Sequence, residues 1–377
     1  MIPFNKPYKT GKETEYIYDA VNSGKISGNG KYTRMCQEFF ENRYSFKKCL
    51  LTTSCTDALE MCSLLIDIKP GDEVIIPSYT FVSTANAFIL RGAKVIFADS
   101  SGQNPNIDED KIEDLITPNT KAIVVVHYAG IACNMEKIMS IADKYNLVVV
   151  EDAAQAVDSF FKKTPLGSIG HLAAFSFHET KNIISGEGGM LVVNDEKFIK
   201  RAEIIWEKGT NRVAFWKGEI NKYGWVDIGS SFLPSEITSA FLYAQLEELD
   251  SIQEKRITIW NEYYNGLKQF GENKKIVLPY LPSYAVNNGH MFFLVCKTNE
   301  ERNRLIKHLA DNNVNAVFHY QSLHKSPFYK DKYEGKELSM SDRYSDCLVR
   351  LPFYFELELE KIRYICKSIL SFYNFNQ

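Results

Sequence analysis

A single lysine, Lys181, lies among small and polar residues in the stretch SFHETKNIISGEGG, residues 176–189. Three glycines follow it closely, at positions Gly186, Gly188 and Gly189. An unprotonated lysine amine condenses with an aldehyde, and burial or a nearby positive charge lowers the lysine pKa enough for this reaction. Glycines allow the chain to pass close to a ligand. Lys181 is therefore a candidate for covalent chemistry, although a loop lysine near glycines is by itself weak evidence.

A carboxylate, Asp152, directly follows the apolar run VVVE, upstream of Lys181. Burying a carboxylate at the end of a strand is unfavourable unless a positive group meets it, and a protonated ring nitrogen would serve. An aspartate that caps the next turn is the structural alternative. Gln155, which follows shortly after, either lies beside Asp152 on one helical turn or is simply solvated.

The third feature is a helix start that could hold an anion. In LLTTSCTDALEM, Ser54, Cys55 and Thr56 precede a helical pattern, and Thr56 is the expected N-cap. The free N–H groups of a helix start bind phosphate, but every helix needs a start, so these residues alone favour a simple capped helix. Taken together, an anion cradle, a buried acid and a lysine that can form a Schiff base point to pyridoxal phosphate. The cradle would hold the phosphate, Asp152 the protonated pyridine nitrogen, and Lys181 the aldehyde.

The elements that must position these residues alternate between strand and helix. The alternation predicts a mostly parallel sheet covered on both faces, with ligands at the carboxyl ends of its strands. Runs rich in Val and Ile predict strands, and apolar residues at helical spacing predict helices between them. The strands are expected at residues 72–78, 93–100, 121–128, 146–154 and 188–195, and two of the helices at 56–68 and 134–146.

Near Pro234 the pattern changes. Residues 234–267 are typical of one long helix, with Ile237, Ala240, Phe241 and Ala244 on one apolar stripe. A strand, a helix, a strand and a final helix follow, at residues 290–297, 301–313, 315–320 and 358–373. We therefore expect a large domain over residues 1–245 and a smaller α+β domain over residues 246–377.

Composition sets the broad class. The 377 residues are 45% hydrophobic and 24% charged, which is ordinary for a globular chain of two domains. A net charge of -3 gives no electrostatic case for nucleic acid as a partner. The eight cysteines form no C-x-x-C pair, so neither a zinc site nor a redox motif is indicated. The start of the chain lacks the apolar core of a signal peptide, and no apolar run approaches the ~18 residues of a membrane span, so we expect a cytoplasmic protein without a membrane partner.

The order and the sequences of these segments resemble those of the DegT/DnrJ/StrS family of sugar aminotransferases, within the fold-type-I pyridoxal-phosphate-dependent transferases. The strongest matches are GDEVIIPSYTFVSTANAFILRGAKVIFAD, EDAAQA and FSFHETKN…GEGG. Matches from MIPFN through EKGTNR to AVFHY and VRLPF cover nearly the whole chain and favour the subgroup that makes dTDP-4-amino-4,6-dideoxygalactose. The resemblance implies an α/β fold with a mostly parallel central sheet in a large domain, a smaller C-terminal α+β domain, and a homodimer with its active site at the interface.

The resemblance also assigns roles to single residues. Lys181 would bind the cofactor covalently and then carry the proton during amino transfer, and Asp152 would pair with the pyridine nitrogen. The other residues expected to contact the cofactor are Phe81, stacked on the ring, Gln155, beside the ring, and Cys55, Thr56 and Ser176, at the phosphate.

Further positions are expected to contact the substrate. His319, Tyr320 and His324 match a loop that borders the sugar, although purely structural roles remain open for them. Arg212 would bind the nucleotide diphosphate, with Lys217 and Lys222 in the same basic stretch. Many relatives carry an Asn that reaches the phosphate of the partner subunit. Ser231 stands at that position here, which puts this contact in doubt.

The implied reaction moves an amino group from L-glutamate to C4 of a nucleotide-linked 4-keto-6-deoxyhexose, for surface glycan synthesis. The expected substrate is dTDP-4-dehydro-6-deoxy-D-glucose and the expected product dTDP-4-amino-4,6-dideoxy-D-galactose. The gluco epimer and amination at C3 of a 3-keto sugar remain open. A regulatory protein on this scaffold would need neither Lys181 nor Asp152, and related dehydratases carry His in place of the lysine, so both residues favour an aminotransferase. No metal is expected.

Overall fold

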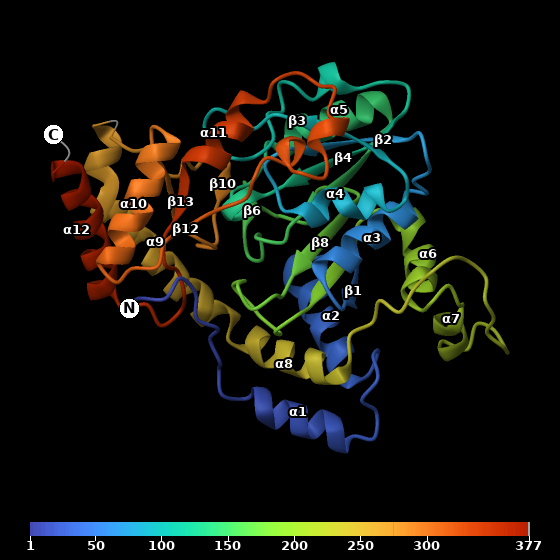
Figure 1. Ribbon diagram of the computed structural model, residues 1–377. Helices are drawn as coiled ribbons and strands as arrows, with labels where there is room; N and C mark the ends of the chain where they lie inside the picture. The colour runs from blue at the N-terminus through green and yellow to red at the C-terminus, as the bar shows by residue number, and fades with distance from the viewer. Residues whose placement is uncertain (274, 376–377) are drawn as a thin grey trace.

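The computed structural model describes residues 1–273 and 275–375, which form a larger and a smaller unit (Figure 1). A seven-stranded sheet in the order β1-β9-β8-β5-β4-β2-β3 forms the larger unit. Five of its strands run parallel, namely β2 (Glu73–Pro77), β3 (Lys94–Ala98), β4 (Thr120–Val126), β5 (Val148–Asp152) and β8 (Leu172–Ser176). Strand β9 (Gly189–Val193) is antiparallel to β8 and to β1 (Lys48–Thr52). The predicted mostly parallel sheet is confirmed, although β1 and β8 were not predicted.

Helices cover both faces of this sheet, which explains why its strands are continuous apolar runs. Along β4, Ile123 and Val125 join one buried cluster, whereas Ala122 and Val124 join the other. The helices on the first face are α2 (Lys31–Tyr44), α5 (Met135–Tyr145) and α8 (Glu236–Glu247). Those on the second face are α3 (Cys55–Leu65), α4 (Val82–Ile89) and α6 (Glu196–Trp206).

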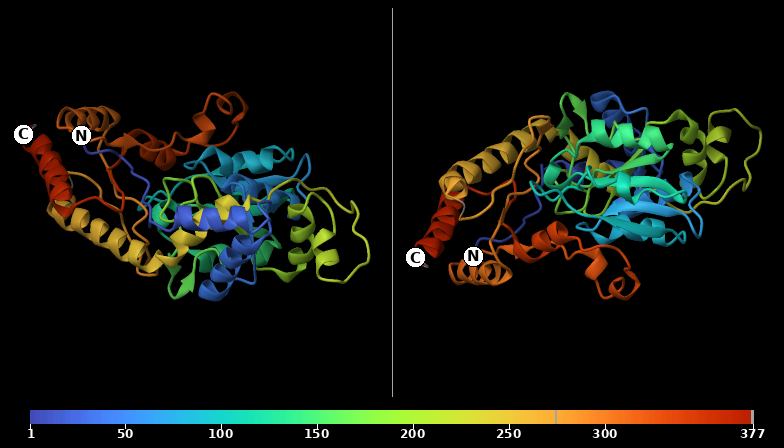
Figure 2. Two further views of the ribbon diagram at one scale, coloured as in Figure 1. Left: turned by 90° about the horizontal axis from the view of Figure 1, so that it is seen from below. Right: turned by 90° about the horizontal axis from the view of Figure 1, so that it is seen from above.

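One long helix, α9 (Leu249–Glu272), connects the two units (Figure 2). Its first turns place Leu249 and Ile252 in the core of the larger unit, and its later turns place Ile259 and Leu267 in the core of the smaller one. The smaller unit has an antiparallel sheet and two further helices. These are β11 (Phe293–Val295), β13 (Leu348–Arg350) and β12 (Val317–Phe318), in that order across the sheet, with α10 (Asn299–Asp311) and α12 (Leu359–Phe375).

The remaining elements are short. They are α1 (Glu13–Asn22), α7 (Arg212–Trp216), α11 (Ser339–Cys347), β6 (Phe160–Phe161), β7 (Thr164–Pro165), β10 (Ala285–Val286) and the 3-10 turns Glu113–Leu115, Tyr128–Gly130, Leu323–Lys325 and Lys330–Lys332. Figure 1 shows α7 at the opposite end of the molecule from α12. Within residues 1–273 and 275–375, no helix combines the length and the apolar character needed to cross a bilayer.

The structure corrects the expected long helix. The chain breaks at Glu248 into α8 and α9, so residues 234–267 are not one helix. The expected apolar stripe is also partly wrong, because Ile237 is 40% exposed while Ala240 is buried. The predicted boundary near residue 245 falls in α8 and stays a proposal. The first residues do not fit that division, because Ile2 forms a β-bridge with Val314 of the smaller unit.

A buried hydrogen-bond network fixes the end of β5, where the candidate site begins. The Glu151 carboxylate accepts hydrogen bonds from the backbone N–H groups of Gly167, Ile169 and Gly170, at 2.8, 2.8 and 2.6 Å. The His127 ring lies 2.9 Å away through Nε2, and its Nδ1 accepts from a backbone N–H, so Nε2 carries the proton and donates. Burial acts to raise the pKa of Glu151, but the bonds from His127 and the loop outweigh it and lower the pKa.

We expect Glu151→Gln to lower the free energy of unfolding by about 2–4 kcal/mol, because the new amide N–H₂ must face a backbone N–H. Glu254→Gln, at an exposed position on α9, is the matched control and should change it by less than about 0.5 kcal/mol. Urea unfolding at pH 7, followed by circular dichroism, compares the midpoints. Equal midpoints for Glu151→Gln and the wild type would contradict this role.

The urea midpoints of Glu151→Gln and the wild type should differ less at acidic pH. The folded-state pKa of Glu151 is lowered, so its stabilisation is present above the unfolded-state pKa and is lost as the pH falls through the folded value. The difference in midpoint should therefore narrow as the pH falls below about 4.3.

Candidate active site

A cavity of about 430 Å³ opens at the carboxyl ends of the parallel strands. Val126, Asp152 and Ser176, the last residues of β4, β5 and β8, all line it. Residues beyond α9 in the chain close its other wall, and these are His290, His319, Tyr320 and Arg350. The cavity thus lies where ligands collect in sheets of this kind.

Lys181 lies in the turn between β8 and β9 and lines this cavity. Burial lowers the pKa of its amine, the neighbouring Cys55 and Asp152 act in the opposite direction, and the Arg350 charge lowers it further. No carboxylate in residues 1–273 or 275–375 forms an ion pair with the Lys181 amine. A lysine with a lowered pKa and no ion-pair partner can act as a nucleophile and as a base.

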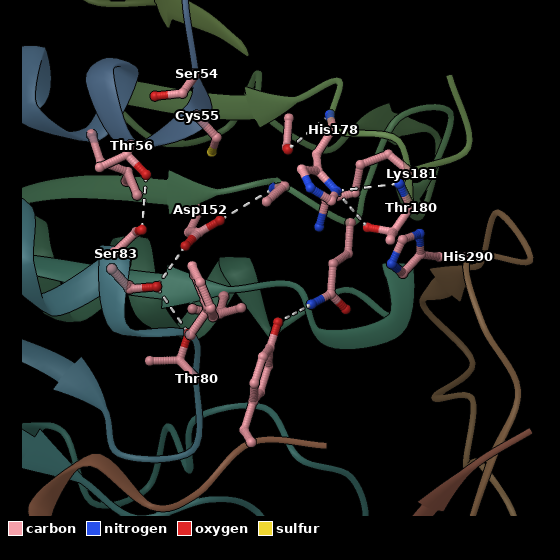
Figure 3. A pocket seen from close by; sticks show the side chains of 18 of the residues that line it. Ser54, Cys55, Thr56, Thr80, Ser83, Asp152, His178, Thr180, Lys181 and His290 are labelled. Carbon is pink, nitrogen blue, oxygen red and sulfur yellow. Dashed lines mark hydrogen bonds between the residues drawn. The ribbon is translucent and has the colours of Figure 1, made fainter. Parts of the chain in front are cut away.

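Asp152 faces the same cavity from the end of β5 (Figure 3). Its Oδ2 accepts a hydrogen bond of 2.7 Å from the Thr84 hydroxyl, and its Oδ1 accepts one of 3.2 Å from the Ala154 N–H. Burial raises the pKa of Asp152, and these hydrogen bonds with the nearby Lys181 charge offset part of that rise. Across the described residues no Lys or Arg pairs with Asp152, so the carboxylate is free to meet a cationic ligand atom.

The start of α3 forms an anion-binding wall. Ser54 is the N-cap, because its hydroxyl accepts from the Asp57 N–H at 3.1 Å, so the predicted N-cap at Thr56 is wrong. Cys55 and Thr56 instead occupy the first turn, where backbone N–H groups have no partner within the helix. A Cβ on Gly189 would lie 2.4 Å from the Cys55 nitrogen, so only glycine lets β9 pass this close to the helix start. Ser176 lines the same cavity.

Two side chains form walls suited to a flat ring. Phe81 lines the cavity and is 55% exposed, and its ring centroid lies 6.0 Å from that of Tyr320. Gln155 is held at both ends of its amide. Its Oε1 accepts from the Ala129 N–H at 2.6 Å, and its Nε2 donates to the Tyr320 hydroxyl at 3.1 Å.

These residues fit pyridoxal phosphate. A helix start suits the phosphate, an unpaired buried carboxylate suits the pyridine nitrogen, and a lysine with a lowered pKa suits the aldehyde. Figure 3 shows the start of α3 on one side of Asp152, and Lys181 with His290 on the other. All seven positions expected at the cofactor line this one cavity, namely Cys55, Thr56, Phe81, Asp152, Gln155, Ser176 and Lys181.

The expected substrate residues divide into two groups. His319 and Tyr320 line the cavity, with ring centroids 3.5 Å apart. His324 does not line it, because the turn at Leu323–Lys325 directs its ring to the Ser78 hydroxyl, with Nδ1 at 2.7 Å. This placement gives no support to a direct substrate contact by His324.

Arg212 also lies outside the cavity of its own chain. It occupies α7, with its guanidinium 4.7 Å from the Tyr223 ring centre and 3.9 Å from the Glu207 carboxylate. Lys217, from the same basic stretch, pairs with Glu203 at 3.0 Å. Neither side chain lines the Lys181 cavity of its own chain.

Sequence reasoning missed several residues that line the cavity, among them Thr84, His290 and Arg350. Thr84 belongs to α4 and had no local signal for its bond to Asp152. His290 and Arg350 come from the smaller unit, at the start of the 290–297 run and at the end of β13. Arg350 stands in the VRLPF segment, which was noted only as a match without a role, so a charged residue at a strand end was the available signal.

Comparison with known proteins agrees with this geometry. Residues 7–370 match the model of the DegT/DnrJ/EryC1/StrS aminotransferase family. GDP-perosamine synthase of Escherichia coli O157:H7 is 33% identical over 380 residues, which cover 99% of each chain. The spore coat polysaccharide biosynthesis protein SpsC of Bacillus subtilis is 31% identical, over 94% of this chain and 92% of that protein.

Solved structures give the same fold. Spr1654 from Streptococcus pneumoniae, provisionally named a sugar aminotransferase, superposes in its PMP-form with a TM-score of 0.91 at 25% identity, over 99% of both chains. Its PLP-form gives a TM-score of 0.90 at 25% identity, over 99% of this chain and 98% of that one. The relatives named here do not carry the name of the dTDP-4-amino-4,6-dideoxygalactose subgroup, so that finer assignment remains a proposal.

The matched family, the fold and the cavity all agree on one kind of enzyme. The cofactor is pyridoxal phosphate, and the chain is a sugar aminotransferase that belongs to the DegT/DnrJ/EryC1/StrS aminotransferase family.

Proposed function

We propose that this enzyme transfers the amino group of L-glutamate to C4 of a nucleotide-linked 4-keto-6-deoxyhexose. The observation that carries the proposal is that Lys181 and Asp152 line one cavity and that neither forms an ion pair with another described residue. The carbon that is aminated and the carrier rest on the resemblance and on the relatives, and they are tested below.

Pyridoxal phosphate, when bound, supplies an electron-withdrawing ring that carries the amino group from one substrate to the other. Asp152 presents its carboxylate to the ring nitrogen and keeps a proton there, and Thr84 with the Ala154 N–H fixes the carboxylate in place. Lys181 Nζ removes the proton from the donor carbon that bears the amine. In the second half of the reaction, run in reverse, the same atom delivers a proton to the sugar carbon.

The remaining cavity residues would bind the cofactor and close the cavity. The first N–H groups of α3 and the Ser176 hydroxyl hold the phosphate. Phe81 and Gln155 would hold the ring in place, and Gln155 is itself fixed by Ala129 and Tyr320. His290 and His319 close the cavity as neutral rings, because burial keeps the pKa of each well below its usual value.

The sugar nucleotide has two candidate carriers. The resemblance favours dTDP-4-dehydro-6-deoxy-D-glucose and a galacto-configured product, whereas two relatives are GDP-perosamine synthases, which makes GDP an alternative carrier. The depth to which the hexose enters the cavity decides which carbon reaches the amine, and the presented face decides the epimer. The gluco epimer and the C3 product would therefore require a different placement of the hexose in the cavity, while the chemistry of Lys181 would be the same.

We further propose that two copies pair through the arm around α7 and the segment that follows it. Several large apolar side chains there are exposed, and Trp225 is 84% exposed, which is unusual for a tryptophan on a monomer. The exposed apolar residues of this region are Phe215, Trp216, Trp225, Val226, Ile228 and Ile237. Such pairing would bring Arg212, Lys217 and Lys222 toward the partner's cavity, where a diphosphate needs cations.

The first prediction concerns Asp152. Asp152→Asn should still attach the cofactor at Lys181 but lose the amino-transfer half-reaction with L-glutamate by about 100-fold or more, because an amide cannot keep the ring nitrogen protonated. Borohydride reduction with peptide mass mapping checks the attachment, and single-turnover absorbance checks the rate. Label on a lysine other than Lys181, or a wild-type rate in the variant, would overturn these assignments.

The second prediction concerns the substrate. Incubation with L-glutamate and a panel of 3-keto and 4-keto 6-deoxyhexoses, on dTDP and on GDP, should yield a C4 amine with galacto configuration from the dTDP-linked 4-keto sugar, read by NMR. Turnover of GDP-linked sugar alone would make the carrier wrong, and turnover of the 3-keto isomer alone would make the carbon wrong. A gluco product would contradict only the configuration.

The third prediction concerns assembly. Sedimentation velocity should find the wild type as a dimer at micromolar concentration, and Trp225→Arg should shift it toward the monomer because a charge would be buried in the apolar interface. Phe328→Arg, at another exposed aromatic outside the arm, is the control and should stay dimeric. A dimer that is indifferent to Trp225→Arg would rule out this arm as the interface.

A further inference from the structure

Tyr320 has an unusual backbone conformation for a large side chain that lines the cavity. Its φ is 52°, in the left-handed region, and among the described residues other than glycine it is the only aromatic one with a positive φ. A bulky side chain reaches this region only at a cost in free energy, so the surrounding structure must hold it there. Contacts from other segments must therefore fix the backbone on both sides of Tyr320.

Tyr320 joins the smaller unit to the two residues expected beside the cofactor ring. Its hydroxyl accepts a hydrogen bond of 3.1 Å from Gln155 Nε2, and its ring centroid lies 6.0 Å from that of Phe81. A shift in the backbone at Tyr320 would therefore change the contacts of both Phe81 and Gln155.

The end of β2 supplies contacts on both sides of Tyr320. The Tyr79 hydroxyl donates to the carbonyl of His319, the residue directly before it. The Ser78 carbonyl accepts from the Leu323 N–H at 2.9 Å, a short distance after it. Two consecutive residues of the larger unit thus hold the chain before and after Tyr320.

His324 adds a side-chain bond to the same strand end. Its backbone N–H donates to Ser78 Oγ at 3.4 Å, and its Nδ1 lies 2.7 Å from the same oxygen. A carboxylate oxygen of Asp342 lies 3.6 Å from Nε2, which favours the proton on that nitrogen. Nδ1 then accepts from the Ser78 hydroxyl, so this hydroxyl is bonded to both the backbone and the ring of His324.

The ring of His324 is enclosed and neutral. The residue is buried, and the Tyr333 ring centroid lies 4.9 Å from that of His324. Burial lowers the pKa of His324, Asp342 and Asp99 act in the opposite direction, and Lys325, which pairs with Asp342 at 2.6 Å, lowers it further. The ring does not line the cavity, so it can act on the reaction only through the residues that it holds.

We propose that His324 is a positioning residue for amino transfer: through Ser78 it holds residues 319–324 in the conformation that places Tyr320 against Phe81 and Gln155. The inference deepens the proposed function and rests on it for the sugar used in the activity assay. It gives His324 an indirect role in place of the substrate contact expected from the sequence. The bond between His324 and Ser78 is the part that a variant can remove while the cavity residues stay unchanged.

Hydrogen exchange of the holoenzyme, read by mass spectrometry, tests the position of residues 319–324 without any substrate. His324→Leu removes the ring nitrogens and should raise the exchange rate of amides in this segment by about ten-fold or more, because its bond to Ser78 is lost. Amides of β4, in the buried sheet, should exchange at the wild-type rate. Faster exchange in β4 as well would indicate general destabilisation, and unchanged exchange in residues 319–324 would show that His324 does not hold them. Either result overturns the proposal.

Two further variants separate the hydrogen bond from the loss of a histidine. His324→Asn places an amide oxygen where Nδ1 lies, so it can accept from the Ser78 hydroxyl and should bring exchange back to within about three-fold of the wild type. His308→Leu is the matched control, because the His308 ring bonds to the Ser368 carbonyl at 3.0 Å, in another part of the smaller unit. It should leave exchange in residues 319–324 within about two-fold of the wild type. Exchange in His324→Asn as fast as in His324→Leu would contradict the role of the bond.

Amino transfer supplies the second readout. In single turnovers of the amine-loaded enzyme with dTDP-4-dehydro-6-deoxy-D-glucose, His324→Leu should lose about ten-fold in efficiency, and His324→Asn should recover most of that loss. Adding His324→Leu to Tyr320→Ala should cost less than about two-fold more, because the side chain through which His324 acts is already gone.

A full ten-fold further loss in the double variant would mean that His324 acts without Tyr320, and it would overturn the proposal. Wild-type efficiency in His324→Leu would do the same. If the wild type aminates none of the keto-sugars, the proposed function is wrong, and the exchange measurement alone decides whether His324 holds residues 319–324.

Discussion

The site depends on an amine and a carboxylate that share a cavity without forming an ion pair. Lys181 and Asp152 each alter the pKa of the other, yet they form no ion pair. A direct pair would remove both the free amine and the unpaired carboxylate on which amino transfer relies. The Thr84 hydroxyl and the Ala154 N–H occupy the two oxygens of Asp152, and the turn after β8 keeps Lys181 on the other side.

The sheet makes that separation rigid because neighbouring residues of a strand point to opposite faces. Asp152 faces the cavity, and Glu151 beside it enters a closed network of three loop amides and the His127 ring. The buried glutamate thus anchors the end of β5 from behind. Asp152, whose carboxylate has no cationic partner among the described residues, is thus held in place by its neighbour Glu151, whose hydrogen bonds are all formed. The network around Glu151 therefore determines how precisely the Asp152 carboxylate is placed.

Local sequence was enough for the parts of the site that local structure builds. Asp152 ends β5, a strand that the sequence predicted, whereas Lys181 and the start of α3 follow β8 and β1, which were recognised only by the residue types beside them. The misses arise where distant segments meet. Ser54 rather than Thr56 caps α3 because β1, which was not predicted, ends at Thr52 and the helix begins at Cys55. Arg350 enters the cavity only through the pairing of β13 with β11 and β12. The ring of His324 turns to Ser78, which lies far away in the chain.

The pairing of the N-terminus with the smaller unit bears on how the chain is assembled during synthesis. All strands of the seven-stranded sheet come from residues 48–193, so this sheet can form while the rest is still being made. The first residues cannot join it, because Ile2 pairs with Val314 and the Phe4 carbonyl accepts from the Phe353 N–H. Ile2 and Phe4 must therefore wait, unpaired, until residues as far as Phe353 have left the ribosome, and the wall that carries Arg350 is completed only after the seven-stranded sheet.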